Sequence, residues 1–234
     1  MVKEKKERDY FFDNLRFIFI FLVVLAHFIS PLSNIYWMKV LYRWIYLFHM
    51  PGMIFISGYF AKKSVEDGKL VKNKVFNLFL IYVIFQIIFT LLNGGKFSIY
   101  QSQNGLWYIQ ILMVYSLLLP LLSRVKAVPM LIISILLGLL VGLDTSAGHI
   151  GSLQRILSFM PFYLFGFYAE KEHLEKAINK KYITIIGIIV LVAIAYFQYK
   201  YLSSFNWTLN LSTGRYAYKA LKISNKTGII ARGC

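Results

Sequence analysis

The stretch that decides the fold class runs from Arg16 to His27 and reads RFIFIFLVVLAH. Ten apolar residues lie between its two ionisable ends. The apolar segment that contains it, Asp13–Leu32, matches the roughly 20 residues that a helix needs to cross a hydrocarbon core of about 30 Å. The stretch therefore predicts a membrane-spanning helix that carries a histidine.

The composition of the whole chain agrees with this first segment. Of the 234 residues, 58% are hydrophobic and only 15% are charged, and the mean hydropathy is +0.60. A soluble domain of this length does not usually have that balance. The apolar runs do not alternate with polar residues, as the strands of a membrane barrel would. We therefore expect an all-α protein, a polytopic bundle of transmembrane helices.

Seven apolar segments are predicted to span the membrane. They are Asp13–Leu32, Leu41–Ala61, Val75–Leu92, Leu106–Leu122, Val128–Leu143, Leu153–Tyr168 and Tyr182–Leu202. Residues 1–12 then form a basic leader, residues 13–203 a transmembrane domain and residues 204–234 a basic tail.

The net charge of +16 lies mainly between the spans, which argues for the bilayer as partner and against nucleic acid. Lysine and arginine gather in the leader and after the second, fourth and sixth spans. This bias predicts a cytoplasmic N-terminus. No Cys/His cluster has metal-ligand spacing, and the one cysteine is Cys234, so we expect no metal.

The tail breaks the charge rule, because five of its residues are basic although seven spans place it outside. Two explanations stay open. The tail returns toward the membrane, or the chain is a truncated or frameshifted product.

Arg16 and His27 are eleven residues apart, close to three helical turns, so they share one helix face about 16 Å apart along the axis. Asp13 lies on the same face. Ionisable residues inside a membrane by default mark functional sites. The alternative for His27 is a hydrogen bond that joins two helices.

His49 in the second span is expected at about the depth of His27, because the first two spans form an antiparallel hairpin. Pro51 follows it, and the alternative interpretation of this stretch is a simple proline kink. Gly52 and Gly58 allow a close approach of another backbone or of a ligand.

Three further residues are weaker candidates near the outer boundary. Trp107 and Tyr108 are typical of an aromatic belt, and the functional alternative is a platform on which a sugar stacks. Arg155 either reaches back to the interface or contacts a substrate.

Four segments together resemble the integral-membrane acyltransferase 3 family, in its fucose 4-O-acetylase-like branch. They are DNLRFIFIFLVVLAHF (13–28), FHMPGMIFISGYF (48–60), LWYIQILMVYSLLLP (106–120) and RILSFMPFYLFGFYAEK (155–171). The Arg-x10-His spacing of Arg16 and His27 is the most telling of them.

The resemblance implies a multi-pass enzyme of the bacterial inner membrane. Such an enzyme takes acetyl from acetyl-CoA and passes it to a sugar hydroxyl of a surface polysaccharide or another envelope glycan. His27 would be the catalytic histidine and Arg16 its motif partner. His49 and Arg155 match motifs of the branch. Together with Asp13, Trp107 and Tyr108, which the residue pattern alone singles out, they are expected to contact substrate or donor. Family members usually have ten or so spans, which is why the seven found here suggest truncation.

The chemistry suits these residue types. A neutral imidazole, expected to be buried, can take the proton of a sugar hydroxyl, and an arginine can hold a phosphate of CoA. Two rivals remain: a polysaccharide transporter of related fold, whose path would also use ionisable residues, and an inactive fragment.

Overall fold

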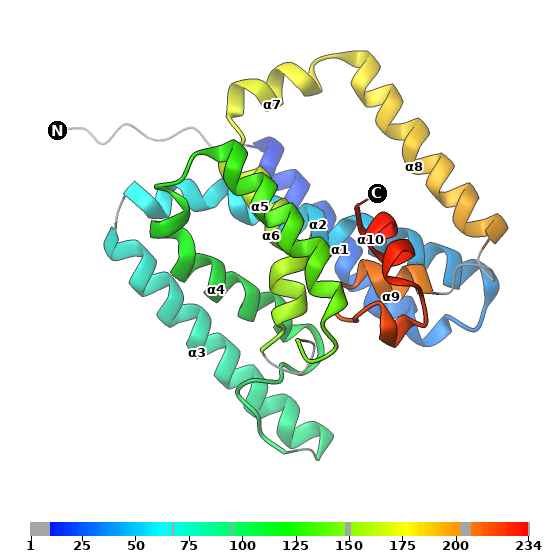
Figure 1. Cartoon of the computed structure of the whole chain (residues 1–234), viewed down its shortest axis with the longest axis horizontal. Coiled ribbons are helices and arrows are strands. Elements are labelled where there is room, and N and C mark those ends of the chain that lie inside the picture. The colour runs from blue at the N-terminus through cyan, green and yellow to red at the C-terminus, as the bar shows by residue number, and fades with distance from the viewer. Residues whose placement is uncertain (1–9, 67, 95, 148–150, 202–206, 234) are drawn as a thin grey trace.

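The computed structural model describes residues 10–66, 68–94, 96–147, 151–201 and 207–233. Most of the predicted basic leader and Cys234 lie outside these residues. Every regular element within them is helical, as the sequence predicts (Figure 1).

The elements follow one another in chain order. They are α1 (Tyr10–Ile29), η1 (Ser30–Leu32), α2 (Tyr36–Glu66), α3 (Gly68–Asn93), η2 (Asn104–Leu106), α4 (Trp107–Leu122), α5 (Ala127–Leu140), η3 (Val141–Leu143), α6 (Leu153–Tyr168), α7 (Lys171–Ile178), α8 (Lys181–Tyr201), α9 (Trp207–Ser212), η4 (Lys219–Leu221) and α10 (Asn225–Gly233).

Each predicted span corresponds to a helix, but the helices differ in how well they suit a bilayer. Three segments of the described chain are long and apolar enough to cross one: Tyr10–Leu32, Val71–Asn93 and Lys181–Lys200. The apolar segments Trp107–Leu122 and Ala127–Leu143 are shorter. The second span lies within α2, which has 31 residues. It contains Arg43, which lies near the start of the predicted span and is only 2% exposed.

Helices α2 and α6 form the central pair of the bundle, and two glycines let their backbones approach. A Cβ added at Gly58 would meet the carbonyl of Tyr163, and one added at Gly166 would meet the carbonyl of Phe55. Small residues are the usual means of such close helix packing in membranes. The prediction that Gly58 permits a close backbone approach is confirmed, whereas Gly52 receives the ring of Phe19 from α1.

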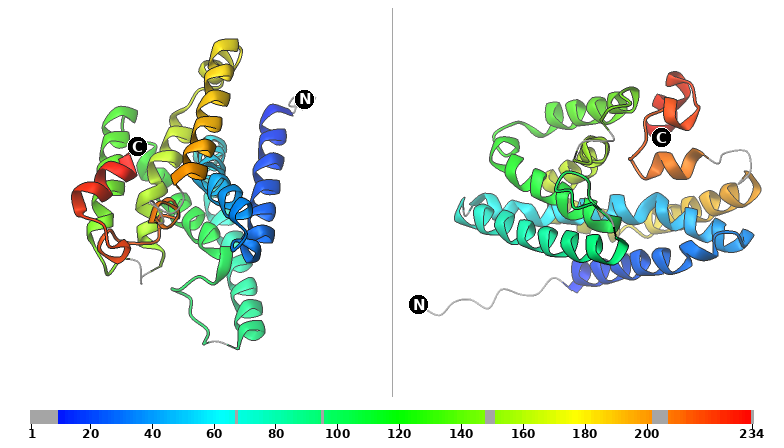
Figure 2. Two further views of the ribbon diagram at one scale, coloured as in Figure 1. Left: turned by 90° about the vertical axis from the view of Figure 1, so that its right-hand side faces the viewer. Right: turned by 90° about the horizontal axis from the view of Figure 1, so that it is seen from below.

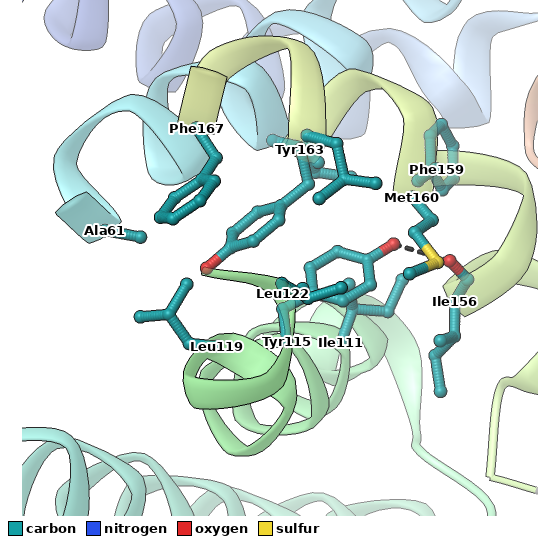
Figure 3. Close-up of a cluster of buried hydrophobic side chains, with 12 residues drawn as sticks. Ala61, Ile111, Tyr115, Leu119, Leu122, Ile156, Phe159, Met160, Tyr163 and Phe167 are labelled. Atoms are coloured by element: carbon teal, nitrogen blue, oxygen red, sulfur yellow. Dashed lines mark hydrogen bonds between the residues drawn. The ribbon is translucent and has the colours of Figure 1, made fainter. Parts of the chain in front are cut away.

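The main core joins this pair to α4 (Figure 3). Tyr115 and Tyr163 pack ring against ring at 4.4 Å, and the hydroxyl of Tyr115 donates to the carbonyl of Ile156 at 2.5 Å. Because α2, α4 and α6 pack around these buried side chains, their ends are held in fixed positions relative to one another.

Helix α8 lies along the edge of the bundle (Figure 1). It contacts α2 through Trp44, whose indole N–H donates to the carbonyl of Leu191 at 3.0 Å, and through Trp37, which stacks on Tyr199 at 4.8 Å. Most of its other side chains are exposed. That is expected of a helix with lipid on its outer side.

The basic tail packs back on the bundle (Figure 2). Tyr218 is fully buried, and its hydroxyl donates to the carbonyl of Leu139 at 2.6 Å. Arg232 lies over the Tyr218 ring at 4.9 Å and donates to the carbonyl of Tyr216 at 3.0 Å. These contacts accompany the placement of residues 210–216 beside the C-terminal part of α1, the N-terminal half of α2 and the start of α6.

Candidate functional site

A cavity of about 460 Å³ lies between α1, α2, α4, α6 and the tail. This volume is within the usual range of ligand pockets. Its lining residues are Ile20, Val23, Val24, His27, Tyr42, Tyr46, His49, Met50, Met53, Gly105, Trp107, Tyr108, Arg155, Phe159, Asn210, Ser212, Thr213, Arg215 and Tyr216. Five of the seven residues singled out in the sequence therefore meet in one place. We call this space the histidine cavity.

The two histidines face the cavity from neighbouring helices, as the predicted hairpin requires. His49 is 3% exposed, packs edge-on against Tyr46, and has its Nδ1 2.7 Å from the carbonyl of Ile45. A carbonyl only accepts, so Nδ1 of His49 carries the hydrogen, and Nε2 of the neutral ring keeps its lone pair. His27, expected to be buried, is exposed with respect to the protein, because α1 packs on α2 through Ala26 and Ile29, the residues beside it in the turn.

Arg16 and Asp13 do not line the histidine cavity. Arg16 lies over the ring of Phe60 at 3.7 Å, near the other end of α2. Nη1 of Arg16 is 3.8 Å from a carboxylate oxygen of Asp13, so the two residues share a helix face as predicted. The guanidinium is thus placed about three turns along α1 from His27.

Trp107, Tyr108 and Arg155 point into the bundle rather than only toward an outer belt. Arg155 lies over the Trp107 ring at 4.4 Å, and Nε of Arg155 donates to the carbonyl of Thr213 at 3.2 Å. Tyr108 and Ser57 share a hydrogen bond of 2.8 Å. These contacts hold Trp107 and Tyr108 of α4 against α6 and α2. The two rings form the aromatic wall of the cavity.

The tail supplies lining residues that the sequence did not indicate. Asn210, Thr213, Arg215 and Tyr216 close one side of the cavity. The only signal in the sequence was the basic character of the tail, which pointed to a return toward the membrane or to truncation. Tyr42 and Tyr46 were also missed, although they lie seven and three residues before His49, on its face of α2.

The comparison with protein families identifies the class of protein. The family model described as an acyltransferase domain, that of the acyltransferase 3 family, matches residues 9–223, and the chain belongs to this family. It is thus a membrane acyltransferase. The match continues past residue 203 into the tail that lines the cavity. The fucose 4-O-acetylase-like branch stays a prediction. Neither the curated proteins nor the solved structures contain a match.

Proposed function

We propose that the protein is an O-acyltransferase that moves an acetyl group from acetyl-CoA to a hydroxyl of a sugar in a surface polysaccharide or another envelope glycan. The observation that supports this most is the meeting of His27, His49, Trp107, Tyr108 and Arg155 in one cavity. A base, hydrogen-bond donors and an aromatic wall are the groups that such a transfer needs.

His27 acts as the base in this proposal. A nitrogen of its imidazole takes the proton of the sugar hydroxyl while the sugar oxygen forms a bond to the thioester carbonyl carbon. The carbon–sulfur bond then breaks, and the CoA thiolate leaves and recovers the proton from the imidazolium. His49 lines the same cavity with its Nε2 lone pair available, so it can accept a hydrogen bond from the acceptor.

The donor is proposed to enter from the end of α1 that carries Arg16. An arginine suits a phosphate of CoA because its charge is permanent and its donors form a planar fork. Phe60 and Asp13 hold the guanidinium in place. A phosphate bound there leaves the thioester end of an extended donor free to reach toward His27.

The charge pattern of the loops supports an orientation in which Arg16 faces the cytoplasm and the histidine cavity faces the opposite side. The donor would then come from inside the cell and the glycan from outside. We place the enzyme in the bacterial inner membrane, with several spans and a cytoplasmic N-terminus, and with bilayer, acyl-CoA and glycan as its partners.

Labelled acetyl-CoA tests this proposal in membranes from cells that express the chain. We expect label in the envelope glycans with the parent and none with His27→Ala. His173→Ala is the matched control, since that exposed histidine pairs with Glu170 beyond the C-terminal end of α6 and does not line the cavity. Equal labelling by the parent and His27→Ala would contradict the mechanism. Transport of unmodified glycan without labelling would favour the transporter.

A further inference from the structure

A second cavity of about 460 Å³ lies beside the first. It is formed by the connection between α3 and α4, the start of α6 and the tail, and polar side chains line most of it. Arg155 and Arg215 line both cavities. We call it the polar cavity. The histidine cavity contains the groups for chemistry, so the question is what the adjoining space binds.

Two buried glutamines from the spans fix the walls of the polar cavity. Gln86 in α3 is fully buried and donates to the carbonyls of Ser98 and Gln101 at 2.7 and 2.8 Å. Gln110 in α4 donates to the carbonyl of Tyr100 at 3.2 Å and accepts from Ser152 at 2.9 Å. The connection is therefore held in one arrangement before any ligand binds.

Three cations and no acid line the polar cavity within the described part of the chain. The cations are Lys96, Arg155 and Arg215, and neither arginine has a carboxylate partner among the described residues. Asp144 is close in the fold, because its carbonyl accepts from Gln154. Asp144 does not line the cavity, and its carboxylate accepts two bonds of 2.7 Å from Ser146. The cavity lining thus carries three positive charges and no negative one, which favours an anion.

The start of α6 adds backbone N–H groups, which also favour an anion. Gly151 and Ser152 both adopt positive φ, 52° and 58°, and α6 begins there with no side-chain cap. Free N–H groups at the start of a helix favour negative charge. Gln154 in this first turn lines the cavity and is 1% exposed. Its Oε1 is buried and has no hydrogen-bond partner in the described chain, so the cavity wall holds one unsatisfied acceptor.

We infer that the polar cavity binds an anionic sugar unit, one that bears a carboxylate or a phosphate, of the glycan acceptor. The cations and the start of α6 bind the charged group, and Gln154 accepts from a hydroxyl. The adjoining unit of the same glycan then reaches His27 past the two arginines that line both cavities. The assignment to the acceptor rests on the proposed function, whereas binding of an anionic sugar does not.

Thermal unfolding of the purified full chain measures this binding without any need for catalysis. The probes are glucose, glucuronate, glucose 6-phosphate and inorganic phosphate. We expect glucuronate or glucose 6-phosphate to raise the unfolding midpoint. The probe with the larger effect shows whether the site prefers a sugar carboxylate or a sugar phosphate. Glucose and inorganic phosphate should have weaker effects, because glucose lacks the charged group and inorganic phosphate lacks the sugar hydroxyls.

Arg215→Gln should weaken the apparent affinity for the effective probe by about ten-fold or more, as expected for a lost charged hydrogen bond. Arg215→Lys should retain part of it. The control is Lys219→Gln, an exposed tail cation that lines neither cavity. Arg215 is exposed as well, so the unliganded midpoints should agree.

Three results would overturn the inference: equal effects of all probes, equal affinity in Arg215→Gln and Lys219→Gln, or displacement of the sugar phosphate by CoA, which would make the cavity a donor site. His27→Ala should bind the probe normally. Because probe binding needs no transfer, a chain that binds the probe but transfers no acetyl would contradict the proposed function and leave this site standing.

Discussion

The two cavities share two arginines and differ in almost everything else. The histidine cavity is built mainly on α1, α2, α4 and α6, with the tail closing one side, and is lined chiefly by imidazoles, phenols and apolar groups. The polar cavity is built mainly on connections that buried glutamines hold. Reacting groups need fixed positions, which packed helices provide. Recognition can use connections, whose side chains vary with little cost to the core. The difference indicates that reaction and recognition occupy separate, adjoining spaces.

The largest expected effect comes from the histidine cavity alone. His27→Ala should lower acyl transfer by about 100-fold or more, the usual contribution of a positioned base, and leave anionic-sugar binding unchanged. Rates of label transfer together with unfolding midpoints measure both properties. A variant that loses binding as well as transfer would mean that the two spaces act as one.

Arg155→Gln should affect both cavities, because Arg155 contacts Trp107 in one and lines the other. Loss of its charged contacts is expected to weaken binding by about ten-fold to 100-fold and to slow transfer as well. Arg155→Lys keeps the charge but not the planar fork, so it should recover only part of the lost binding and transfer. Transfer rates and probe titrations of the pair check this. Full activity in Arg155→Gln would remove the proposed link between the cavities.

Trp107→Leu tests the aromatic wall of the histidine cavity. It removes the ring under Arg155 and the stacking with Phe159, which lies 5.6 Å away. Such contacts contribute about 0.5–1.5 kcal/mol each, so transfer should fall by about ten-fold, and Trp107→Phe should fall less. Probe binding in the polar cavity serves as the internal control. Weaker probe binding with an unchanged rate of transfer would contradict the placement of Trp107 in the wall of the histidine cavity.

The smallest effect concerns Ser152 at the rim of the polar cavity. Ser152→Gly and Ser152→Ala both remove the hydroxyl that donates to Gln110, but only glycine adopts a φ of 58° without strain. The glycine variant should be more stable than the alanine variant by about 1 kcal/mol. Denaturant unfolding of the two variants measures the difference. Equal stabilities would mean that the backbone there relaxes.

Much of the helical architecture follows from the sequence because apolar runs near 20 residues have few alternatives in a bilayer. The expected meeting of His27 with His49 follows from the hairpin and helix geometry. The burial of Arg43 could not be foreseen, since one basic residue near a span end is usually a topology signal. Its place depends on the full 31-residue length of α2.

The polar cavity and the share of the tail in both cavities were not predictable either. Gln86 and Gln110 are recognisable as buried polar residues, but their partners are backbone groups of a connection, which carry no sequence signal. The return of residues 210–216 depends on the packing of Tyr218 beside Gly142. Such contacts between distant segments leave no periodic pattern in either one.

The most direct test of this account is the dependence of acyl transfer on acceptor concentration. The reconstituted full chain, His27→Gln and Arg215→Gln would each receive labelled acetyl-CoA and increasing amounts of envelope glycan. We expect His27→Gln to lose the saturating rate, and Arg215→Gln to keep that rate but require more glycan to reach it. Absence of transfer by the parent chain, or loss of the same parameter in both variants, would contradict the separation of reaction from recognition.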